Sequence, residues 1–223
     1  VLTPEKPPLA IVELMTLILS FWPLWLTLLL IAVLRLPMMK SKIGELYVRI
    51  YLRFSLARTE YTILNNITVP LTDGGTAQFD HIIIAKYGIF VIETKNISGR
   101  IFSNEKHKRW TKIKHNKKSS FKNPLRARHL RSNPLAELLS LPEELIHSVV
   151  IFTPVATFKN TPPVNVGHAQ KMVTYVKGFN YKCFDSINIK NILTSIHGKK
   201  CKPSLATDIA HIKYLKAKKA SSP

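Results

Sequence analysis

The segment from residue 78 to residue 95 constrains the fold more than any other part of this 223-residue chain. It holds two short runs of β-branched and aromatic residues, 82–85 and 89–94, on either side of a turn that contains glycine. Two such runs joined by a glycine-containing turn are typical of a β-hairpin. The segment therefore predicts two antiparallel strands.

Three charged side chains of this hairpin are expected on one face. If Tyr87 and Gly88 form the loop, Asp80 lies across from Lys95, and a four-residue loop would place Asp80 across from Glu93. Side chains alternate along a strand and cross-strand partners share a side, so both registers bring the three together. A three-residue loop would break this parity.

Two carboxylates and an ammonium group on one face are the layout of a metal-dependent nuclease site. Carboxylate oxygens hold Mg²⁺ or Mn²⁺, the ion activates a water, and a lysine offsets charge at the phosphorus. The alternative is a surface ion-pair ladder worth less than about 1 kcal/mol. Glu93 and Lys95 close an almost wholly apolar strand, where unpaired charge is costly, and this favours a functional role.

A third ligand is expected from a helix earlier in the chain. Residues 41–54 have the spacing of an amphipathic helix, with an apolar stripe at positions 43, 46, 47, 50, 54 and 57. Glu45 lies at the edge of that stripe and could add an oxygen ligand. Its alternative role is a first-turn glutamate favoured by the helix dipole.

Several motifs together resemble the nuclease-related domain, or NERD domain, over about residues 41–155. They are Ile43-Gly44-Glu45, the Val69-Pro70 segment, Gln78-Phe79-Asp80-His81, the run from Gly88 to Asn96, Gly99-Arg100-Ile101, Trp110 and Asn123-Pro124-Leu125. The domain belongs, by resemblance of its motifs, to the PD-(D/E)xK restriction-endonuclease-like group.

This resemblance implies an α/β fold in which helices flank a mixed sheet. It implies that Glu45, Asp80 and Glu93 bind Mg²⁺, with Mn²⁺ possible, and that Lys95 assists phosphodiester hydrolysis. It also suggests a catalytic role near the site for Gln78, whose alternative is a polar residue at the start of a strand.

An apolar segment precedes this domain. Residues 14–36 contain a single charge, Arg35, and about 20 apolar residues can span a bilayer. We therefore expect one N-terminal transmembrane helix that Pro23 kinks, with a re-entrant hairpin as the alternative. Basic residues follow the segment and only Lys6 precedes it, so the positive-inside rule predicts that the C-terminal domain is cytoplasmic. We therefore expect a single-pass protein of the plasma or inner membrane.

Charge favours an anionic partner. The formal net charge is +20, and residues 105–131 hold eleven Lys or Arg and one acid. We expect nucleic acid to be bound by Lys106, Lys108, Arg109, Lys112, Lys114, Lys117, Lys118, Lys122, Arg126 and Arg128. The alternatives are a surface that binds anionic lipid and a mobile solvated loop.

The remaining pattern is α/β. It predicts helices at about 124–140 and 168–177, strands at 148–153 and 164–166, and a final helix from about 202 or 204 to 219. We divide the chain into a membrane anchor at 1–37, a nuclease core at 38–160, and a C-terminal α/β completion of the same domain at 161–223. Two distant cysteines give no support for a zinc ribbon.

The function predicted from these features is a membrane-anchored, Mg²⁺-dependent endonuclease that hydrolyses DNA, with RNA possible. The alternative is a catalytically inactive membrane protein that binds nucleic acid or anionic lipid.

Overall fold

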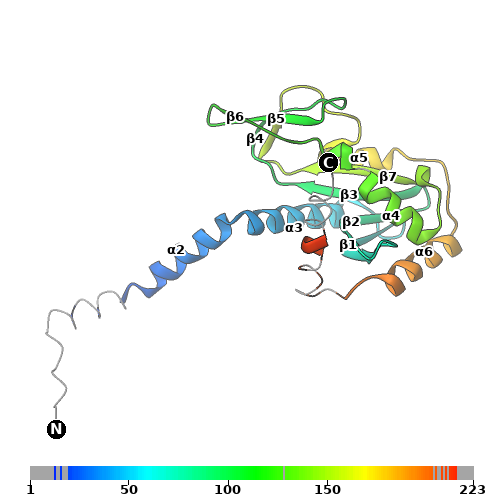
Figure 1. Ribbon diagram of the computed structural model, residues 1–223, viewed down its shortest axis with the longest axis horizontal. Coiled ribbons are helices and arrows are strands. Elements are labelled where there is room, and N and C mark those ends of the chain that lie inside the picture. The colour runs from blue at the N-terminus through cyan, green and yellow to red at the C-terminus, as the bar shows by residue number, and fades with distance from the viewer. Residues whose placement is uncertain are drawn as a thin grey trace, which may run out of the picture. The chain divides into compact units, whose positions relative to one another are not determined.

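The computed structural model describes residues 13, 16, 20–127, 129–202, 204, 207, 209 and 211–214. The chain divides into two compact units, Val1–Ile43 and Gly44–Pro223. The first unit contains helix α2 (Trp22–Arg35) and the beginning of α3 (Pro37–Ser55), as labelled in Figure 1.

A transmembrane helix is expected at residues 14–36, and none is found in the described part of that range. Within the part of the chain that the structure describes, no helix is long and apolar enough to cross a membrane. Helix α2 has 14 residues, whereas a span needs roughly 20. Pro23 lies in the first turn of α2, where a proline is accommodated without a kink. Residues 14–15 and 17–19 of the expected span lie outside the described residues.

A mixed five-stranded sheet forms the centre of the second unit. Its strand order is β1-β2-β3-β7-β9. The bounds are Tyr61–Pro70, Thr76–Ala85, Gly88–Lys95, Ile146–Phe152 and Val166–His168. Strands β1, β2 and β3 pair antiparallel, while β7 and β9 run parallel to β3. The predicted mixed α/β fold is therefore confirmed.

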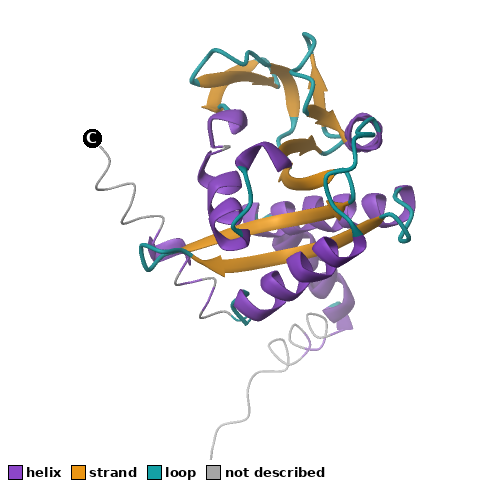
Figure 2. Cartoon of the chain, turned by 90° about the vertical axis from the view of Figure 1, so that its right-hand side faces the viewer, coloured by secondary structure: helices purple, strands orange, loops and turns teal. Residues whose placement is uncertain are grey.

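Helices cover both faces of this sheet, as Figure 2 shows. On one face, Val48 and Leu52 of α3 share a buried cluster with Val173 of α5 (Ala169–Lys177). On the other face, Leu135 of α4 (His129–Leu139) shares a second cluster with Ile192 of α6 (Ser186–Lys199). Each helix thus buries an apolar side against the sheet, which is how layered domains close their cores.

Helix α3 buries a stripe different from the predicted one. The residues that face the core follow a spacing of four, and they are Gly44, Val48, Leu52 and, just past the helix, Leu56. The predicted stripe is exposed instead, with Phe54 at 85% and Ile50 at 48% exposure. Both sides of this helix are apolar, so periodicity alone could not decide which side packs.

A second, four-stranded sheet has the order β6-β5-β4-β8. Its strands are β4 (Gly99–Phe102), β5 (Arg109–Lys114), β6 (Lys117–Lys122) and β8 (Ala156–Phe158). The basic segment, for which a mobile solvated loop was one alternative to a binding surface, is largely a β-hairpin. Its turn residues His115 and Asn116 have φ angles of 47° and 58°, the left-handed pair of a tight hairpin.

The small sheet begins where β3 ends. Lys95 pairs with Phe152, and Gly99 pairs with Ala156 at the same sequence offset, so the β3–β7 ladder resumes as β4–β8. Gly99 has a φ of 114°, and a Cβ there would lie 2.6 Å from the carbonyl oxygen of Ile113. A glycine is required at this junction because the two backbones approach so closely.

The C-terminal part contains a helix that sequence reasoning missed. Helix α6 begins at a capping box, in which Asp185 accepts from the Asn188 amide and the Asn188 side chain accepts from the Asp185 amide. The predicted helices near 124–140 and 168–177 correspond to a 3₁₀ turn at Pro124–Ala127 followed by α4, and to α5. Much of the predicted final helix lies outside the described residues.

Candidate active site

The turn of the β2–β3 hairpin fixes which charged residues meet. Ala85 pairs with Gly88, so Lys86 and Tyr87 form a two-residue turn. The ladder runs as far as the pair His81 and Ile92, and the next position in this register sets Asp80 opposite Glu93. This is one of the two registers expected from the sequence, and it preserves the shared face.

Asp80 is held at the point where β2 leaves β3. Its Oδ2 accepts a hydrogen bond from the backbone N–H of Thr94 at 2.8 Å, beyond the last paired residues of the ladder. The carboxylate thereby takes the place of a backbone acceptor for a strand amide. This bond fixes Asp80 beside the Glu93 and Lys95 segment.

Glu93 and Lys95 form a close ion pair. The Lys95 Nζ lies 2.5 Å from Glu93 Oε1, and the side chains are 31% and 6% exposed respectively. A buried carboxylate is costly unless it is paired, so Lys95 supplies the countercharge that Glu93 requires. Because the lysine reaches in from a more exposed position, its ammonium group can also face solvent or a ligand.

Gln78 lies two residues before Asp80 on β2. Its Nε2 donates to Asn66 Oδ1 at 3.0 Å, and Asn66 has a φ of 51° in the middle of β1. Asparagine tolerates this left-handed conformation better than most residues. Gln78 is therefore fixed to the neighbouring strand, and its catalytic role stays a prediction.

Helix α3 brings Glu45 to the same end of β3. A Cβ on Gly44 would lie 3.0 Å from the Cβ of Asn96 and 3.2 Å from Cγ2 of Thr153, so the helix backbone packs closely there. Asn96 directly follows Lys95, and its Oδ1 accepts from the Thr153 hydroxyl at 2.8 Å. Glu45 is half-buried beside this contact, and its role as a metal ligand stays a prediction.

The donor chemistry of this site fits a hard divalent cation. In the described part of the chain, no group of three or more His, Cys, Asp or Glu is placed to hold a metal. Asp80 and Glu93 still offer two carboxylates at positions that the β2–β3 register sets opposite each other. Mg²⁺ is commonly bound through one or two carboxylates, with water and substrate phosphates completing its shell. Two carboxylates would therefore suffice.

His81 next to Asp80 is a packing residue. Its ring is 2% exposed, and Nδ1 lies 2.8 Å from Asn65 Oδ1. Burial, with a smaller effect from the charge of Arg49, lowers the pKa of His81 to about 4. The imidazole is therefore neutral near pH 7.

Two motif residues, Trp110 and Asn123, organise a loop of the small sheet. Trp110 Nε1 donates to the carbonyl oxygen of Asn104 at 2.7 Å. The buried Asn123 Nδ2 donates to the carbonyl oxygens of Glu105 at 3.0 Å and His107 at 2.9 Å. The sequence predicts that Trp110, as an aromatic residue within the basic segment, can stack on a base, but its ring is 1% exposed and is not accessible to one. Together with Asn123 it instead fixes the loop at 104–107.

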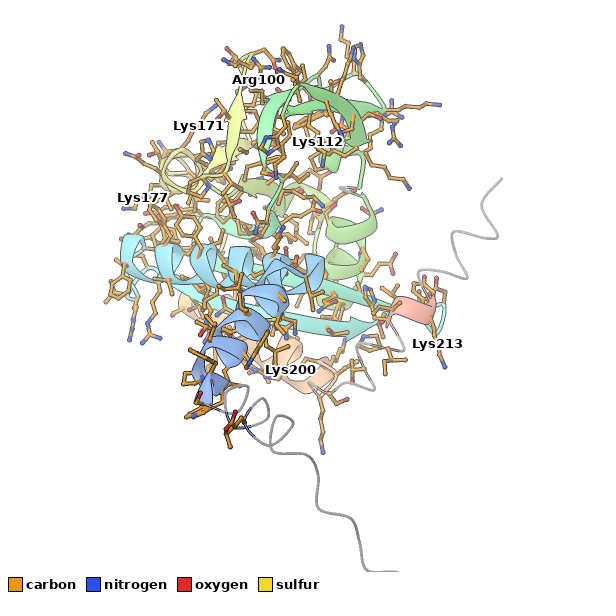
Figure 3. All side chains as sticks on the ribbon, turned by 90° about the vertical axis from the view of Figure 1, so that its left-hand side faces the viewer. Arg100, Lys112, Lys171, Lys177, Lys200 and Lys213 are labelled. Carbon is orange, nitrogen blue, oxygen red and sulfur yellow. The ribbon has the colours of Figure 1, made fainter. Side chains whose placement is uncertain are left out.

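The predicted nucleic-acid-binding residues are dispersed over the small sheet and its neighbours. Lys106 and Lys108 lie in the loop before β5, Arg126 lies in the 3₁₀ turn, and Arg128 is outside the described residues. The others lie on the β5–β6 hairpin, at Arg109, Lys112, Lys114, Lys117, Lys118 and Lys122. Figure 3 shows Arg100 and Lys112 on this sheet and Lys171 and Lys177 on α5, so basic side chains also lie beyond the predicted set.

One face of the small sheet combines these charges with an aromatic ring. A hollow of about 410 Å³ is lined by Phe102, Arg109, Lys118 and the loop residue His107, among others. Phe102 is 41% exposed. Arg109 donates through Nε to Ser120 Oγ at 2.8 Å, which orients its guanidinium along the sheet. An exposed aromatic ring among basic groups can stack on a base beside a phosphate.

Comparison with known proteins finds a family that includes the residues of this site. Residues 40–153 match the family model of the nuclease-related domain, which covers α3, the β2–β3 hairpin, β4 to β6 and β7. The chain belongs to the nuclease-related domain family. The domain's description relates it to nucleases, and the resemblance read from the motifs is confirmed.

A relative supports the same assignment. An uncharacterized protein of Bacillus anthracis is 38% identical over 150 residues, which are 67% of this chain and 68% of that protein. No solved structure matches the chain. Family membership therefore suggests a nuclease-like function that acts on nucleic acid.

Proposed function

We propose that this nuclease-related domain protein is a metal-dependent endonuclease that hydrolyses phosphodiester bonds of DNA, with RNA as a possible second substrate. The observation that supports this most is the joint placement of Asp80, Glu93 and Lys95 where the β2–β3 ladder ends, with Asp80 inside β2 and the other two at the end of β3. A pair of carboxylates and an ammonium group at one strand end suits phosphodiester hydrolysis.

Each residue has a chemical role in this proposal. Asp80 and Glu93 would hold Mg²⁺ or Mn²⁺, and the bound ion would supply Lewis-acid chemistry for phosphodiester hydrolysis. When no metal ion is bound, the ammonium group of Lys95 neutralises Glu93. During the reaction it can turn to the phosphate, where negative charge grows. Glu45 and Gln78 lie on the elements next to this site, and we assign them a supporting ligand and a positioning role.

The face of the small sheet that carries Phe102, Arg109 and Lys118 is the proposed path for nucleic acid. This sheet is close to the candidate site along the chain. Its residue Arg100 is five residues after Lys95, so the two Cα atoms are at most about 18 Å apart. Phe102 can stack on a base while Arg109 and Lys118 contact phosphates. Glu105 is the one acid between Gly99 and Ala127, a range that the structure describes throughout, so this face attracts polyanions.

We also propose that the N-terminal segment attaches the protein to the plasma or inner membrane, with the nuclease domain in the cytoplasm. The apolar side chains of α2 support this, since Trp22, Trp25 and Leu29 are each more than half exposed. Alkaline carbonate extraction of membranes from expressing cells tests it. Retention in the pellet is expected, and complete release into the supernatant would contradict attachment by an apolar segment.

The nuclease proposal is tested with the full chain. Labelled single-stranded DNA, duplex DNA and RNA are incubated with Mg²⁺, Mn²⁺ or EDTA, using wild type, Glu93→Gln and Lys95→Met. We expect metal-dependent cleavage that each substitution lowers roughly 100-fold or more, because charge stabilisation at a transition state is worth that much.

The matched control is Lys86→Met. Lys86 is the other hairpin lysine with a glutamate partner, Glu60 at 3.6 Å, but that pair is exposed at the turn. Its loss should leave cleavage within about twofold, as for an exposed ion pair of small energy. Cleavage that survives in both site variants would overturn the proposal, and salt-sensitive binding without cleavage would favour an inactive nucleic-acid-binding domain.

A further inference from the structure

Helix α3 presents a second apolar face on the side opposite the core. Leu46, Tyr47, Ile50 and Phe54 are between 37% and 85% exposed, at the spacing of one helical stripe. Surface helices normally place polar residues on this side. A helix that is apolar on two opposite sides is expected to be covered on both. Among the residues that the structure describes, the core covers the side with Val48 and Leu52 and not the outer stripe.

A cationic hollow lies beside this stripe. Arg49, Arg53 and Arg58 line a depression of about 350 Å³ together with Tyr61, Thr62, Ile63 and Asn65. Arg49 and Arg53 are one helical turn apart, so their guanidinium groups lie on the same side of α3. Among the described residues that line the hollow there is no acid, and the nearby Glu60 is paired with Lys86 at 3.6 Å.

We propose that the outer stripe of α3 and the arginine hollow form a binding site for a membrane surface that contains anionic lipid. The apolar stripe enters the boundary between headgroups and acyl chains, and the helix lies in the plane of the membrane without crossing it. The hollow takes an anionic headgroup, because a guanidinium group binds phosphate oxygens in pairs. This surface is separate from Asp80, Glu93 and Lys95, so it does not depend on the nuclease proposal.

Two features favour a membrane over other partners. Nucleic acid would satisfy the arginines but would leave Leu46, Ile50 and Phe54 without apolar contacts. A second copy could cover the stripe, yet two chains of formal charge +20 repel each other. An anionic bilayer supplies apolar depth and negative charge at once. Figure 3 shows α3 (light blue) running across the front of the view.

The test measures vesicle binding by the full chain. Co-sedimentation is compared between vesicles of phosphatidylcholine alone and of an equal mixture with phosphatidylglycerol. We expect wild type to prefer the anionic vesicles. Arg49→Gln/Arg53→Gln should reduce that preference roughly tenfold or more, because each arginine near an anionic membrane surface strengthens binding to it. The ratio between the two vesicle types is the readout because exposed apolar residues of α2 affect both equally.

Two controls make the result specific. Lys118→Gln/Lys122→Gln removes the same charge from the small sheet and should leave the preference within about twofold. Ile50→Ser/Phe54→Ser should weaken binding to both vesicle types while the secondary structure, followed by circular dichroism, is retained. Glu93→Gln should bind vesicles like wild type, which separates this proposal from the nuclease proposal.

Three outcomes would overturn the inference. An unchanged preference in the arginine variant would show that the hollow does not bind headgroups. An equal loss in the Lys118→Gln/Lys122→Gln control would show only a general effect of charge. A dimer seen by light scattering that Ile50→Ser/Phe54→Ser disperses, without any change in vesicle binding, would show that a second copy covers the stripe.

Discussion

Glu93 is a buried carboxylate at the end of an almost wholly buried strand, and Lys95 is its close partner. The sequence could predict that two charged residues end an otherwise apolar strand, which is unusual because burying charge is costly. It could not predict the contact itself, because residues two apart on a strand share a face without having to touch. The side-chain conformation that joins them depends on the surrounding burial.

Removing the ammonium group should therefore destabilise the fold. We expect Lys95→Met to lower the free energy of unfolding by about 2 kcal/mol, because it removes the countercharge from a buried carboxylate. Glu93→Gln/Lys95→Met should recover most of that loss, since no buried charge is then left. Urea unfolding at pH 7 measures both variants. A loss in the double variant equal to that in Lys95→Met would contradict this explanation.

His81 should make stability depend on pH. Its pKa is about 4 in the fold because of burial, against about 6.5 when unfolded. Above pH 6.5 the ring is neutral in both states, and its contribution to stability is intact. As the pH falls toward 4 the unfolded chain binds a proton that the folded chain does not, and up to about 3 kcal/mol is lost.

Urea unfolding between pH 7 and pH 4.5 tests this prediction. Wild type should lose more stability across this range than His81→Asn, whose side chain does not titrate there. Parallel losses in the two proteins would show that His81 is not the group responsible.

At the scale of elements, the β2–β3 hairpin was the most predictable part. Its alternation and its turn limited the register to a few choices, and the structure has one of them, with Ala85 paired to Gly88. Helix α3 was predicted in place but with the wrong buried side. The decisive residue is Gly44, whose lack of a side chain lets the helix approach Asn96, and a long-range contact of this kind leaves no periodic signal.

Gly44→Ala tests that close approach. Alanine is favoured over glycine inside a helix by about 1 kcal/mol, but a Cβ at 3.0 Å from Asn96 Cβ forces the helix to move. We expect a net loss of roughly 1 kcal/mol in thermal or urea unfolding, together with reduced cleavage. Gly198→Ala in α6 is the matched control, since a Cβ added at Gly198 would have no neighbouring atom within 4 Å, and it should leave stability equal or higher.

At the scale of the whole molecule, the small four-stranded sheet was not predicted from the sequence. Its strands are short and rich in lysine, and β8 joins β4 from more than fifty residues away along the chain, so neither pattern nor propensity signals the pairing. The net charge of +20 predicted an anionic partner, yet the fold distributes that charge over several surfaces. Composition alone could not assign each surface to its partner.

Salt dependence separates these surfaces. If the small sheet binds nucleic acid, Lys118→Gln/Lys122→Gln should weaken binding to single-stranded DNA and reduce the slope of log affinity against log salt by roughly 1 to 2. Arg49→Gln/Arg53→Gln removes the same charge and should leave that slope unchanged. Fluorescence anisotropy over a salt series measures both. Equal effects of the two variants would contradict separate surfaces.

The central claim is that Asp80 and Glu93 together hold a divalent cation beside Lys95. Its most direct test is isothermal titration of Mn²⁺ into the metal-free full chain, repeated with Asp80→Asn and Glu93→Gln. We predict one saturable site in wild type and its loss in both variants, with folding confirmed by circular dichroism. Equal Mn²⁺ binding by all three folded proteins would contradict the claim.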